Sequence, residues 1–508
     1  MTEQIMTDHE NYYLDVCGYV IIRNALAQAE LDTYNSAFDQ VVAQDGSLPE
    51  FSSSSYPFLQ LRDHPVLSGY LQEILGEGYK PDEGPELIGH AAASGDGRLV
   101  GGSEWVDWSR AYRHQAGTRL CQAVRVLWAL ADINPGDGGL VLIPASHNGQ
   151  VEIPEDVLSG NDDMRLLVQP TMKAGDLLVC AHSVAHGMRP WLGKSPSRTL
   201  AWTFISAQMP LSSWRRPAYT ENRSKDWASS LTPVEQALLR DPRRMSTPGQ
   251  VLSDGKTSWL EESEQIHHPS IYIRNPVSGI DEKEFYHWDL CGHLVIRGLM
   301  DKQWLAAANE AIDANADGIH VGPSGAGRTS KRLAGTHGAS MAEPWDLPEP
   351  YCEPFRRMIA HPGLIQRLNW IMGSGFECMS SSIFAHRKGG VGHYLHSGTA
   401  TTLVGNHVRL QNGRAYSEHI NVGWQLRDVT PADGGFCCIP GSHKGRYPLP
   451  EGIASCDDDT MDSVQHVGLE AGDVLLFHAA SQTHGAFPWT GEQDRRVAFF
   501  YYRGRNVR

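Results

Sequence analysis

Two pairs of histidine and arginine residues, one in each half of the chain, have the types and spacing needed to hold a metal chelate. His484 follows the apolar run GDVLLFHAA, and Arg496 comes twelve residues later; His186 follows GDLLVCA, and Arg198 also comes twelve residues later. Imidazole is a common metal ligand, and the planar guanidinium binds a carboxylate through two hydrogen bonds. If each pair lies on neighbouring strands of one barrel, it can hold a metal and the far carboxylate of a chelating acid.

The choice of arginine in the second pair depends on strand alternation. Arg495 stands directly before Arg496, and successive side chains of a strand point to opposite faces, so only one of the two faces the barrel interior. In the first pair, Ser197 precedes Arg198. Counting from Arg198 therefore selects Arg496.

The two pairs belong to a repeat that extends along most of the chain. Three segments recur in the same order: DVCGYVIIRNAL (15–26) with DLCGHLVIRGLM (289–300), VRVLWALADINPGDGGLVLIPASHNG (124–149) with INVGWQLRDVTPADGGFCCIPGSHKG (420–445), and AGDLLVCAHSVAHGMRPW (174–191) with AGDVLLFHAASQTHGAFPW (471–489). The middle segments are identical at 13 of 26 positions, with an offset of 296. Three ordered matches indicate a tandem duplication, with a net 22 extra residues in the second copy between about Arg297 and Leu395.

The elements that must position these residues are mostly β-strands. Short apolar or alternating runs separated by Gly, Pro and Asp turns predict strands over 124–133, 138–144, 176–181 and 198–205. Helical spacing predicts helices over 27–44 and 301–316. Evenly spaced short strands of this kind are typical of a sandwich or barrel.

Composition excludes several classes of protein. The 508 residues carry 43 Lys and Arg against 59 Asp and Glu, a net charge of −16, which argues against nucleic-acid or anionic-membrane partners. The apolar runs are too short for a membrane helix, and the acidic start MTEQIMTDHENYY is not that of a signal peptide. Nine cysteines without Cys-x-x-Cys spacing favour reduced thiols and a cytoplasmic location.

At its repeated motifs the chain resembles the phytanoyl-CoA dioxygenase family of iron(II)- and 2-oxoglutarate-dependent oxygenases. The resemblance rests on CGYVIIR and CGHLVIR near the start of each copy, DGGLVLIPASH and DGGFCCIPGSH in the middle, and AGD…HG…R at the end. It implies a mostly β fold with flanking helices, made of two double-stranded β-helix (jelly-roll, cupin-like) domains in tandem. The expected boundaries are 1–207 for the first domain, 208–278 for a linker with a short helix, and 279–508 for the second.

The resemblance also implies roles for the repeated residues. His484 would be the distal iron ligand, Arg496 would bind the C5 carboxylate of 2-oxoglutarate, and His186 and Arg198 would be their counterparts in the first copy. The family's usual proximal pattern is His-x-Asp, but this chain has His396-Ser397-Gly398, without the acid.

The two copies are not equivalent at the proximal position. The offset of 296 places Val100 where the second copy has His396, and a valine side chain cannot bind iron. The loss of one ligand usually disables such a site. We therefore expect a catalytic second domain beside a first domain that has lost its metal, the two forming an intramolecular pseudo-dimer.

The third iron ligand remains open in the sequence. One alternative is a side chain from a nearby segment, with Glu418, His419, His407 and His478 as candidates. The other follows from the halogenase branch of these oxygenases, where Gly or Ala at the acid position leaves room for a halide, which Gly398 would allow. A missing acid in a short motif does not by itself establish a new reaction.

The resulting hypothesis is a dioxygenase that hydroxylates or otherwise oxidises an unactivated C–H bond of a small metabolite. Its cofactors would be iron(II) and 2-oxoglutarate, with succinate and carbon dioxide as co-products. The first alternative is a halogenase that also takes chloride, and the second is a catalytically dead double barrel that only binds a ligand. The histidines of the two matching turns, His147 and His443, are interpreted as hydrogen-bonding residues of the scaffold and not as ligands.

Overall fold

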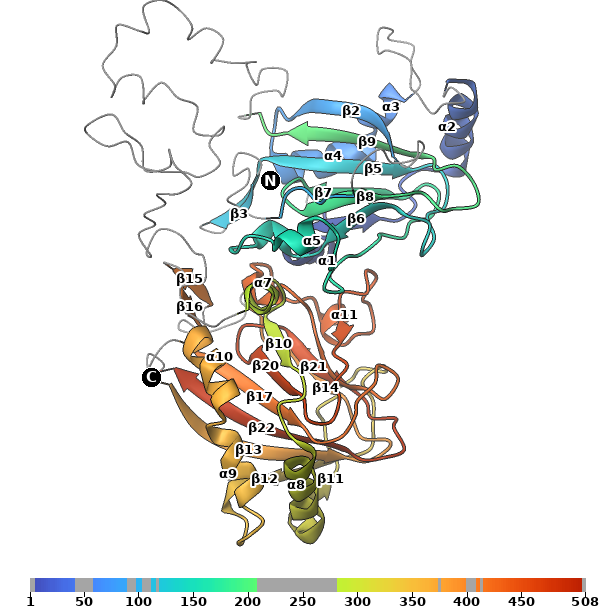
Figure 1. The fold of residues 1–508 in the computed structure, drawn as a ribbon. Coiled ribbons are helices and arrows are strands. Elements are labelled where there is room, and N and C mark those ends of the chain that lie inside the picture. Colours follow the sequence, from blue (N-terminus) through green and yellow to red (C-terminus); the bar gives the residue numbers. More distant parts are fainter. Residues whose placement is uncertain are drawn as a thin grey trace, which may run out of the picture.

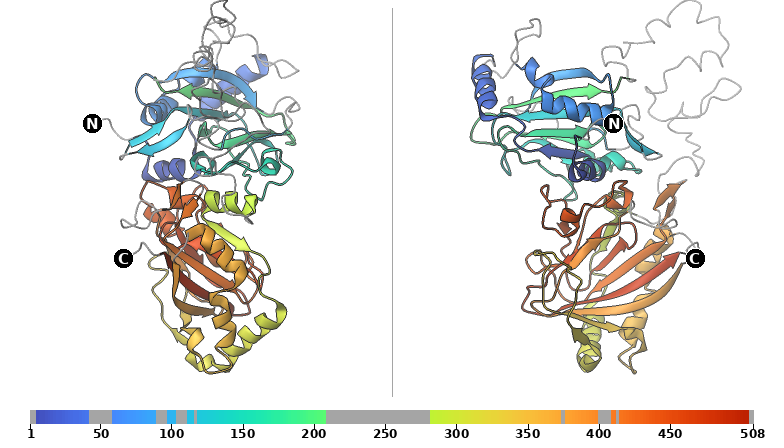
Figure 2. Two further views of the ribbon diagram at one scale, coloured as in Figure 1. Left: turned by 60° about the vertical axis from the view of Figure 1, so that its left-hand side comes forward. Right: turned by 180° about the vertical axis from the view of Figure 1, so that it is seen from behind.

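The protein is described here from a computed structural model, which covers residues 5–41, 58–88, 97–102, 111–115, 118–207, 281–372, 376–398, 408–411 and 414–504. These residues form an N-terminal lobe (5–207) and a C-terminal lobe (281–504), each mostly β-sheet with flanking helices, which lie end to end (Figures 1 and 2). None of the described helices is long and apolar enough to cross a membrane. The expected linker over 208–278, with its short helix, lies outside the described residues.

The N-terminal lobe is built on a five-stranded antiparallel sheet. Its helices are α1 (Asp8–Cys17), α2 (Gln28–Val41), α3 (Leu59–Arg62), α4 (Pro65–Leu75) and α5 (Glu155–Leu158). Its strands are β1 (Tyr19–Ile22), β2 (Lys80–Ile88), β3 (Tyr112–Gln115), β4 (Thr118–Cys121), β5 (Ala123–Ala129), β6 (Gly139–Ile143), β7 (Leu177–Ala181), β8 (Ala185–Arg189) and β9 (Thr199–Ile205). The four strands and the helix predicted in this lobe are found as β5, β6, β7, β9 and α2.

The C-terminal lobe repeats these elements and adds others. Its helices are α7 (Glu282–Cys291), α8 (Lys302–Ala314), α9 (Glu353–Ile359), α10 (Pro362–Met372) and α11 (Glu451–Ala454). Its strands are β10 (His293–Ile296), β11 (His320–Gly322), β12 (Gly338–Ala342), β13 (Phe376–His386), β14 (His393–His396), β15 (Arg409–Gln411), β16 (Arg414–Tyr416), β17 (His419–Gln425), β18 (Gly435–Cys438), β19 (Gln465–His466), β20 (Val474–His478), β21 (His484–Phe487) and β22 (Arg495–Gly504). The helix predicted over 301–316 is found as α8.

The main sheets of the two lobes have the same strand order over five strands. The N-terminal order is β1-β7-β5-β9-β2, and the C-terminal order is β10-β20-β17-β22-β13, followed by β12 and β11 at the edge. A smaller sheet faces each main sheet: β6-β8 in the N-terminal lobe and β14-β21-β18-β19 in the C-terminal lobe. The added strands β11 and β12 fall in the stretch where the sequence predicts extra residues, so much of that insertion extends the C-terminal sheet.

The helix that opens each lobe ends in the same way, for a reason visible in the sequence. Gly18 after α1 and Gly292 after α7 have φ of 83° and 79°, the left-handed conformation that favours glycine. A Cβ atom at either position would lie 2.5 Å from the Nδ1 atom of a buried imidazole, that of His147 or His443. These imidazoles hydrogen-bond through Nε2 to the backbone carbonyls of Asp15 (2.9 Å) and Asp289. Both histidines therefore belong to the scaffold, as interpreted from their equal spacing.

The first helix of each lobe packs into the hydrophobic core of the other lobe. One core cluster joins Tyr12 and Leu14 of α1 to Leu395 and Cys437 on the smaller C-terminal sheet. A second cluster joins α7 to the smaller N-terminal sheet in the same manner, for example Trp288 to residues of β6. Figure 1 shows α1 and α7 at the junction of the lobes. The two halves thus form one packed unit through reciprocal contacts.

Candidate functional site

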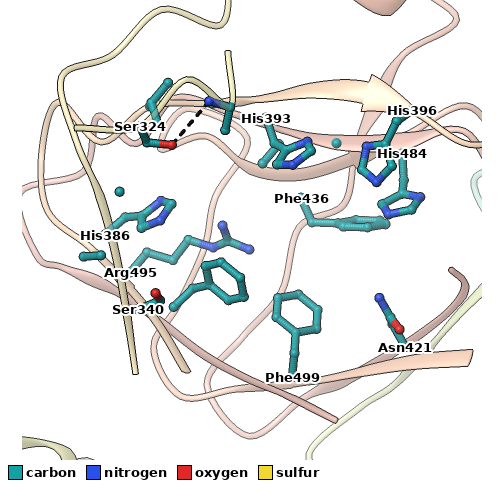
Figure 3. Close-up of a pocket in the computed structure, with 18 of the residues that line it drawn as sticks. Ser324, Ser340, His386, His393, His396, Asn421, Phe436, His484, Arg495 and Phe499 are labelled. Atoms are coloured by element: carbon teal, nitrogen blue, oxygen red, sulfur yellow. Dashed lines mark hydrogen bonds between the residues drawn. The ribbon is translucent and has the colours of Figure 1, made fainter. Parts of the chain in front are cut away.

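The smaller sheet of the C-terminal lobe brings His396 and His484 together. Their Cα atoms are directly paired between β14 and β21, and their ring centroids lie 4.3 Å apart. Both line a cavity of about 480 Å³ between the two sheets of the lobe, shown in Figure 3. The aromatic rings of Phe436 and Phe477 pack against His484, with ring centroids at 6.1 and 4.7 Å. The sequence singled out both histidines, and the fold makes them neighbours.

Both imidazoles are held in the form that binds a metal. The Nδ1 atom of His396 donates to the carbonyl of Tyr394 at 3.0 Å, and that of His484 donates to the carbonyl of Gln482 at 2.8 Å. A carbonyl can only accept, so in each ring the proton is on Nδ1 and Nε2 keeps its lone pair. Burial lowers the pKa of His484 to about 3 and also lowers the pKa of His396, so both rings are neutral at pH 7. The pair fits a divalent metal ion.

The arginine that faces this cavity is Arg495, so the prediction that Arg496 faces the barrel interior is wrong. Arg495, Phe499 and Tyr501 line the cavity from alternate positions of β22, whereas Arg496 does not line it. Arg495 is buried, its Nε atom has no hydrogen-bond partner, and burial lowers its pKa to about 10. No described carboxylate forms an ion pair with it. A guanidinium in this environment fits the carboxylate of a bound acid.

Arg496 and Arg198 make matching structural contacts in the two lobes. Arg496 points to the opposite face of β22, where it pairs with Asp313 of α8 (2.5 Å) and with Asp494 (2.7 Å). In the N-terminal lobe, Arg198 pairs with Asp39 of α2. The spacing shared by the two copies therefore reflects an arginine that ties a helix to the sheet. The position before Arg198 is Ser197, whose hydroxyl donates to the carbonyl of Ile88 at 2.6 Å.

A third histidine of the cavity was missed by the sequence analysis. His393 lies on β14 with its ring centroid 4.6 Å from that of His396, and it also lines the cavity. Regular alternation would place residues three apart on opposite faces of a strand, but the pairing of β14 with β21 is irregular between His393 and His396. The bulge brings both side chains to one face. The His-x-x-His spacing was visible in the sequence, but the bulge was not.

The candidates for a third ligand do not join the pair within the described residues. Glu418, His419 and His478 do not line the cavity, and His478 is buried between the rings of Trp288 and His443. His407 lies outside the described residues. The one described group of three or more potential ligands within 4.8 Å of one another is Glu349, Cys352 and Glu353, which is remote from this cavity. Across the described chain, no carboxylate accompanies His396 and His484.

The equivalent position in the N-terminal lobe lacks a second histidine. His186 pairs with Val100 across an isolated bridge, as His484 pairs with His396, and its Nδ1 atom donates to the carbonyl of Val184 at 2.7 Å. Arg125 acts on His186 electrostatically and forms a 2.5 Å ion pair with Glu86. A cavity of about 10 Å³ between these sheets is lined by residues such as Leu127, Leu140 and Ser197, and His186 does not line it. Val100 therefore offers no second ligand beside His186, and the charges of Arg125 and Glu86 that act on His186 are of opposite sign.

The chain was compared with known proteins. A model of the phytanoyl-CoA dioxygenase (PhyH) family matches residues 100–199 and 288–497, more than half of the chain. A comparison with curated proteins finds no match.

Several solved structures are similar to part of the chain. HygX from Streptomyces hygroscopicus, solved with nickel, 2-oxoglutarate and hygromycin B, is 21% identical, with 45% of this chain and 90% of HygX covered and a TM-score of 0.37. SnoN, an alpha ketoglutarate dependent epimerase from nogalamycin biosynthesis, is 20% identical, with 44% and 82% covered and a TM-score of 0.32. AviO1 from Streptomyces viridochromogenes Tue57 is 14% identical, with 44% and 96% covered and a TM-score of 0.33.

Proposed function

The chain belongs to the phytanoyl-CoA dioxygenase family and is an iron(II)- and 2-oxoglutarate-dependent oxidoreductase, and from that premise we propose that it oxidises an unactivated C–H bond of a small molecule at a single iron site in its C-terminal lobe. His396 and His484 would hold the iron. The observation that carries this proposal is the pair of neutral imidazoles with both Nδ1 protons committed to backbone carbonyls and both Nε2 atoms available. When bound, iron(II) and 2-oxoglutarate would activate dioxygen, which is the oxidant, with succinate and carbon dioxide as co-products.

Arg495 would bind the C5 carboxylate of 2-oxoglutarate. Figure 3 shows it with His386 on one side of the cavity and the two imidazoles on the other. The unpartnered Nε atom and the aromatic surroundings favour an anion that completes the pairing of the guanidinium. Phe436, Phe477 and Phe499 would keep water away from the reacting groups, since they supply rings and no hydrogen-bonding atoms.

The residues of the protein orient these groups without moving a proton themselves. The carbonyls of Tyr394 and Gln482 fix the two imidazole rings before any ligand arrives, so binding requires no tautomer change. The side chain of His386 is neutral at pH 7, because burial lowers its pKa to about 4. It can therefore lie beside Arg495 without adding a second positive charge.

A halogenase is the second candidate, because no described carboxylate lies with the two histidines. Gly398 has φ of +113°, and a Cβ atom there would lie 2.9 Å from the Thr483 hydroxyl. An aspartate at this position would consequently be strained, which favours a site without a protein carboxylate. A halide would then occupy the vacant ligand position, and the product would be a halogenated substrate.

We propose that the two lobes arose by duplication and that the first no longer binds iron. The domains would span 1–207 and 279–508, joined by 208–278. Val100 in place of His396 supports an inert first site, because its side chain offers no ligand atom. His186 and Arg198 then remain as scaffold residues.

The inert lobe would act as a support for the iron-binding strands. The Tyr12 hydroxyl of α1 lies 3.4 Å from that of Thr483, the neighbour of His484. The carboxylate of Asp15 accepts a hydrogen bond from the backbone of Arg446 at 2.5 Å. Reciprocally, Asp289 of α7 accepts one from the backbone of Gln150 at 2.9 Å. These contacts support an intramolecular pseudo-dimer.

The proposed function is tested by anaerobic titration of the full-length apoprotein with iron(II) and 2-oxoglutarate. We expect the weak visible band of the chelate in the wild type and in His186→Ala, but not in His484→Ala. Admission of oxygen should then yield succinate. A protein that forms neither band nor succinate lacks the proposed site.

Chloride separates the two candidate reactions. In a halogenase, chloride added to the anaerobic chelate should shift the band of the wild type, whereas an oxygenase without a halide site should show no shift. Gly398→Asp should then abolish the effect, and Gly398→Ala, which carries the same backbone strain without the charge, should retain it.

A further inference from the structure

The cavity wall contains a segment that has no counterpart among the described residues of the N-terminal lobe. Residues 320–342, which include β11 and β12, extend the C-terminal sheet beyond β13, whereas the N-terminal sheet ends at β2. This segment contributes His320, Ser324 and Ser340 to the cavity wall. Between the N-terminal sheets, the described residues enclose a cavity of about 10 Å³ that His186 does not line, against about 480 Å³ here. The added wall is thus a feature of the open cavity alone.

The described residues of the cavity wall carry positive charge and no negative charge. No described residue that lines the cavity is an aspartate or glutamate, and Arg495 is its one arginine or lysine. At the edge of the site, the Arg328 guanidinium stacks over the Tyr394 ring at 4.6 Å and acts electrostatically on His396. The iron ion, when bound, and Arg495 would make the cavity positive; at its edge, the Arg328 charge is accompanied by the carboxylate of Glu451, which accepts a hydrogen bond from the Tyr394 hydroxyl. A cationic substrate would meet no carboxylate among the described residues that line the cavity.

The rest of the cavity surface suits a substrate that contains a ring. Phe384, Phe436, Phe477, Phe499 and Tyr501 line the cavity, and the amide of Asn421 points into it from β17 (Figure 3). Aromatic walls favour flat apolar groups, since stacked or edge-on contacts add to the burial of their surface. The hydroxyls of Ser324 and Ser340 and the Asn421 amide can hydrogen-bond a neutral polar group. An ammonium group would lose its hydration here without gaining an ion pair, and its attraction to the aromatic faces, about 0.5–2 kcal/mol, would offset only part of that cost.

We propose that the substrate is a ring-containing small molecule without positive charge, and that the wall formed by residues 320–342 selects it. This inference rests on the proposed function for the position of the site, but it concerns binding and can be tested without turnover.

The turn at Ser324 offers a matched pair of variants. The Ser324 hydroxyl accepts a hydrogen bond from the backbone of Ala326 at 3.3 Å. Aspartate and asparagine make the same contact with the residue two positions later, so both preserve the turn. Ser324→Asp adds a carboxylate to the wall, and Ser324→Asn adds the same bulk without charge. Neither substitution touches the proposed iron ligands or Arg495.

The test measures binding of two matched probes by calorimetry to full-length protein with iron(II) and 2-oxoglutarate, without oxygen. Tryptophol and tryptamine share a ring and chain and differ in a hydroxyl against an ammonium group. We expect tryptophol to bind at least about tenfold more tightly to the wild type and to Ser324→Asn. In Ser324→Asp this preference should fall at least about threefold, because the ammonium gains a partner.

Two results would overturn the inference: tryptamine binding to the wild type as tightly as tryptophol, or tryptophol failing to bind protein in which the chelate band has formed. Absence of the band with the probe preference intact would count against the proposed iron site and not against the substrate class.

Discussion

Replacing Arg495 and Arg496 separately should have opposite effects, because the two side chains lie on opposite faces of β22. Arg495 is buried without a described carboxylate partner, and burial lowers its pKa from 12.5 to about 10. At 1.36 kcal/mol for each pKa unit, burial of this charge opposes folding by about 3 kcal/mol. Arg495→Met should therefore leave the apoprotein as stable as the wild type or more stable, since removing a buried unpaired charge is often neutral or favourable. The same change should weaken 2-oxoglutarate binding by ~2 kcal/mol or more, about 30-fold.

Arg496→Met should show the reverse pattern. It removes ion pairs with Asp313 and Asp494, of which the former side chain is 61% exposed, so we expect a loss of only ~1–2 kcal/mol of stability. Binding of 2-oxoglutarate should be unchanged. Urea denaturation of the apoproteins measures the first quantity, and anaerobic titration of the chelate band measures the second. If Arg496→Met lost 2-oxoglutarate while Arg495→Met kept it, the assignment from strand alternation would be wrong.

Three further results are expected. His484→Ala should reduce turnover to background while His186→Ala retains most of it, measured as succinate release; equal losses would contradict the inert first lobe. Tyr12→Phe should weaken iron(II) binding about fivefold, since it removes one hydroxyl contact worth ~1 kcal/mol beside an iron-binding strand, whereas Tyr13→Phe, which loses a contact to a different loop, should not; equal effects would argue against a specific support. Burial lowers the pKa of His478 to about 3, so the folded protein keeps this ring neutral while the unfolded chain takes up a proton below about pH 6.5. This imidazole favours the folded state fully above that pH, and its contribution is lost on acidification at about 1.4 kcal/mol per pH unit. Urea melts at pH 7.5, 6 and 5 should show the slope and its reduction in His478→Gln; a flat profile would contradict it.

The main-sheet strands and the histidines that the fold brings together, His396 and His484, could be predicted because they depend on local patterns. Apolar runs between Gly and Pro turns indicated the strands of the N-terminal lobe, and an offset between repeats aligned His396 with Val100, which face His484 and His186 at the same place in each lobe. These predictions needed no knowledge of side-chain packing.

The arginine and the third histidine could not be predicted from the same patterns. Arg496 was chosen because its spacing is shared with Arg198, but the shared contact is a helix clamp. His393 faces the cavity through a break in strand alternation that no residue type announces. The residues shared by the two copies are those that both lobes need in order to fold, whereas the residues of the cavity differ between the copies.

The differences between the two lobes at these positions all favour a metal site in the C-terminal lobe over one in the N-terminal lobe. This is the strongest argument for a single metal site. Val100 replaces the imidazole of His396, and Arg125 places a guanidinium where the C-terminal lobe has the neutral amide of Asn421. Leu127 lines the small cavity of the N-terminal lobe. An imidazole at position 100 alone would still face the Arg125–Glu86 ion pair in place of a neutral amide. A metal site needs ligands, a favourable field and space together, and the changes at positions 100 and 125 support the proposal that the N-terminal lobe no longer holds a metal.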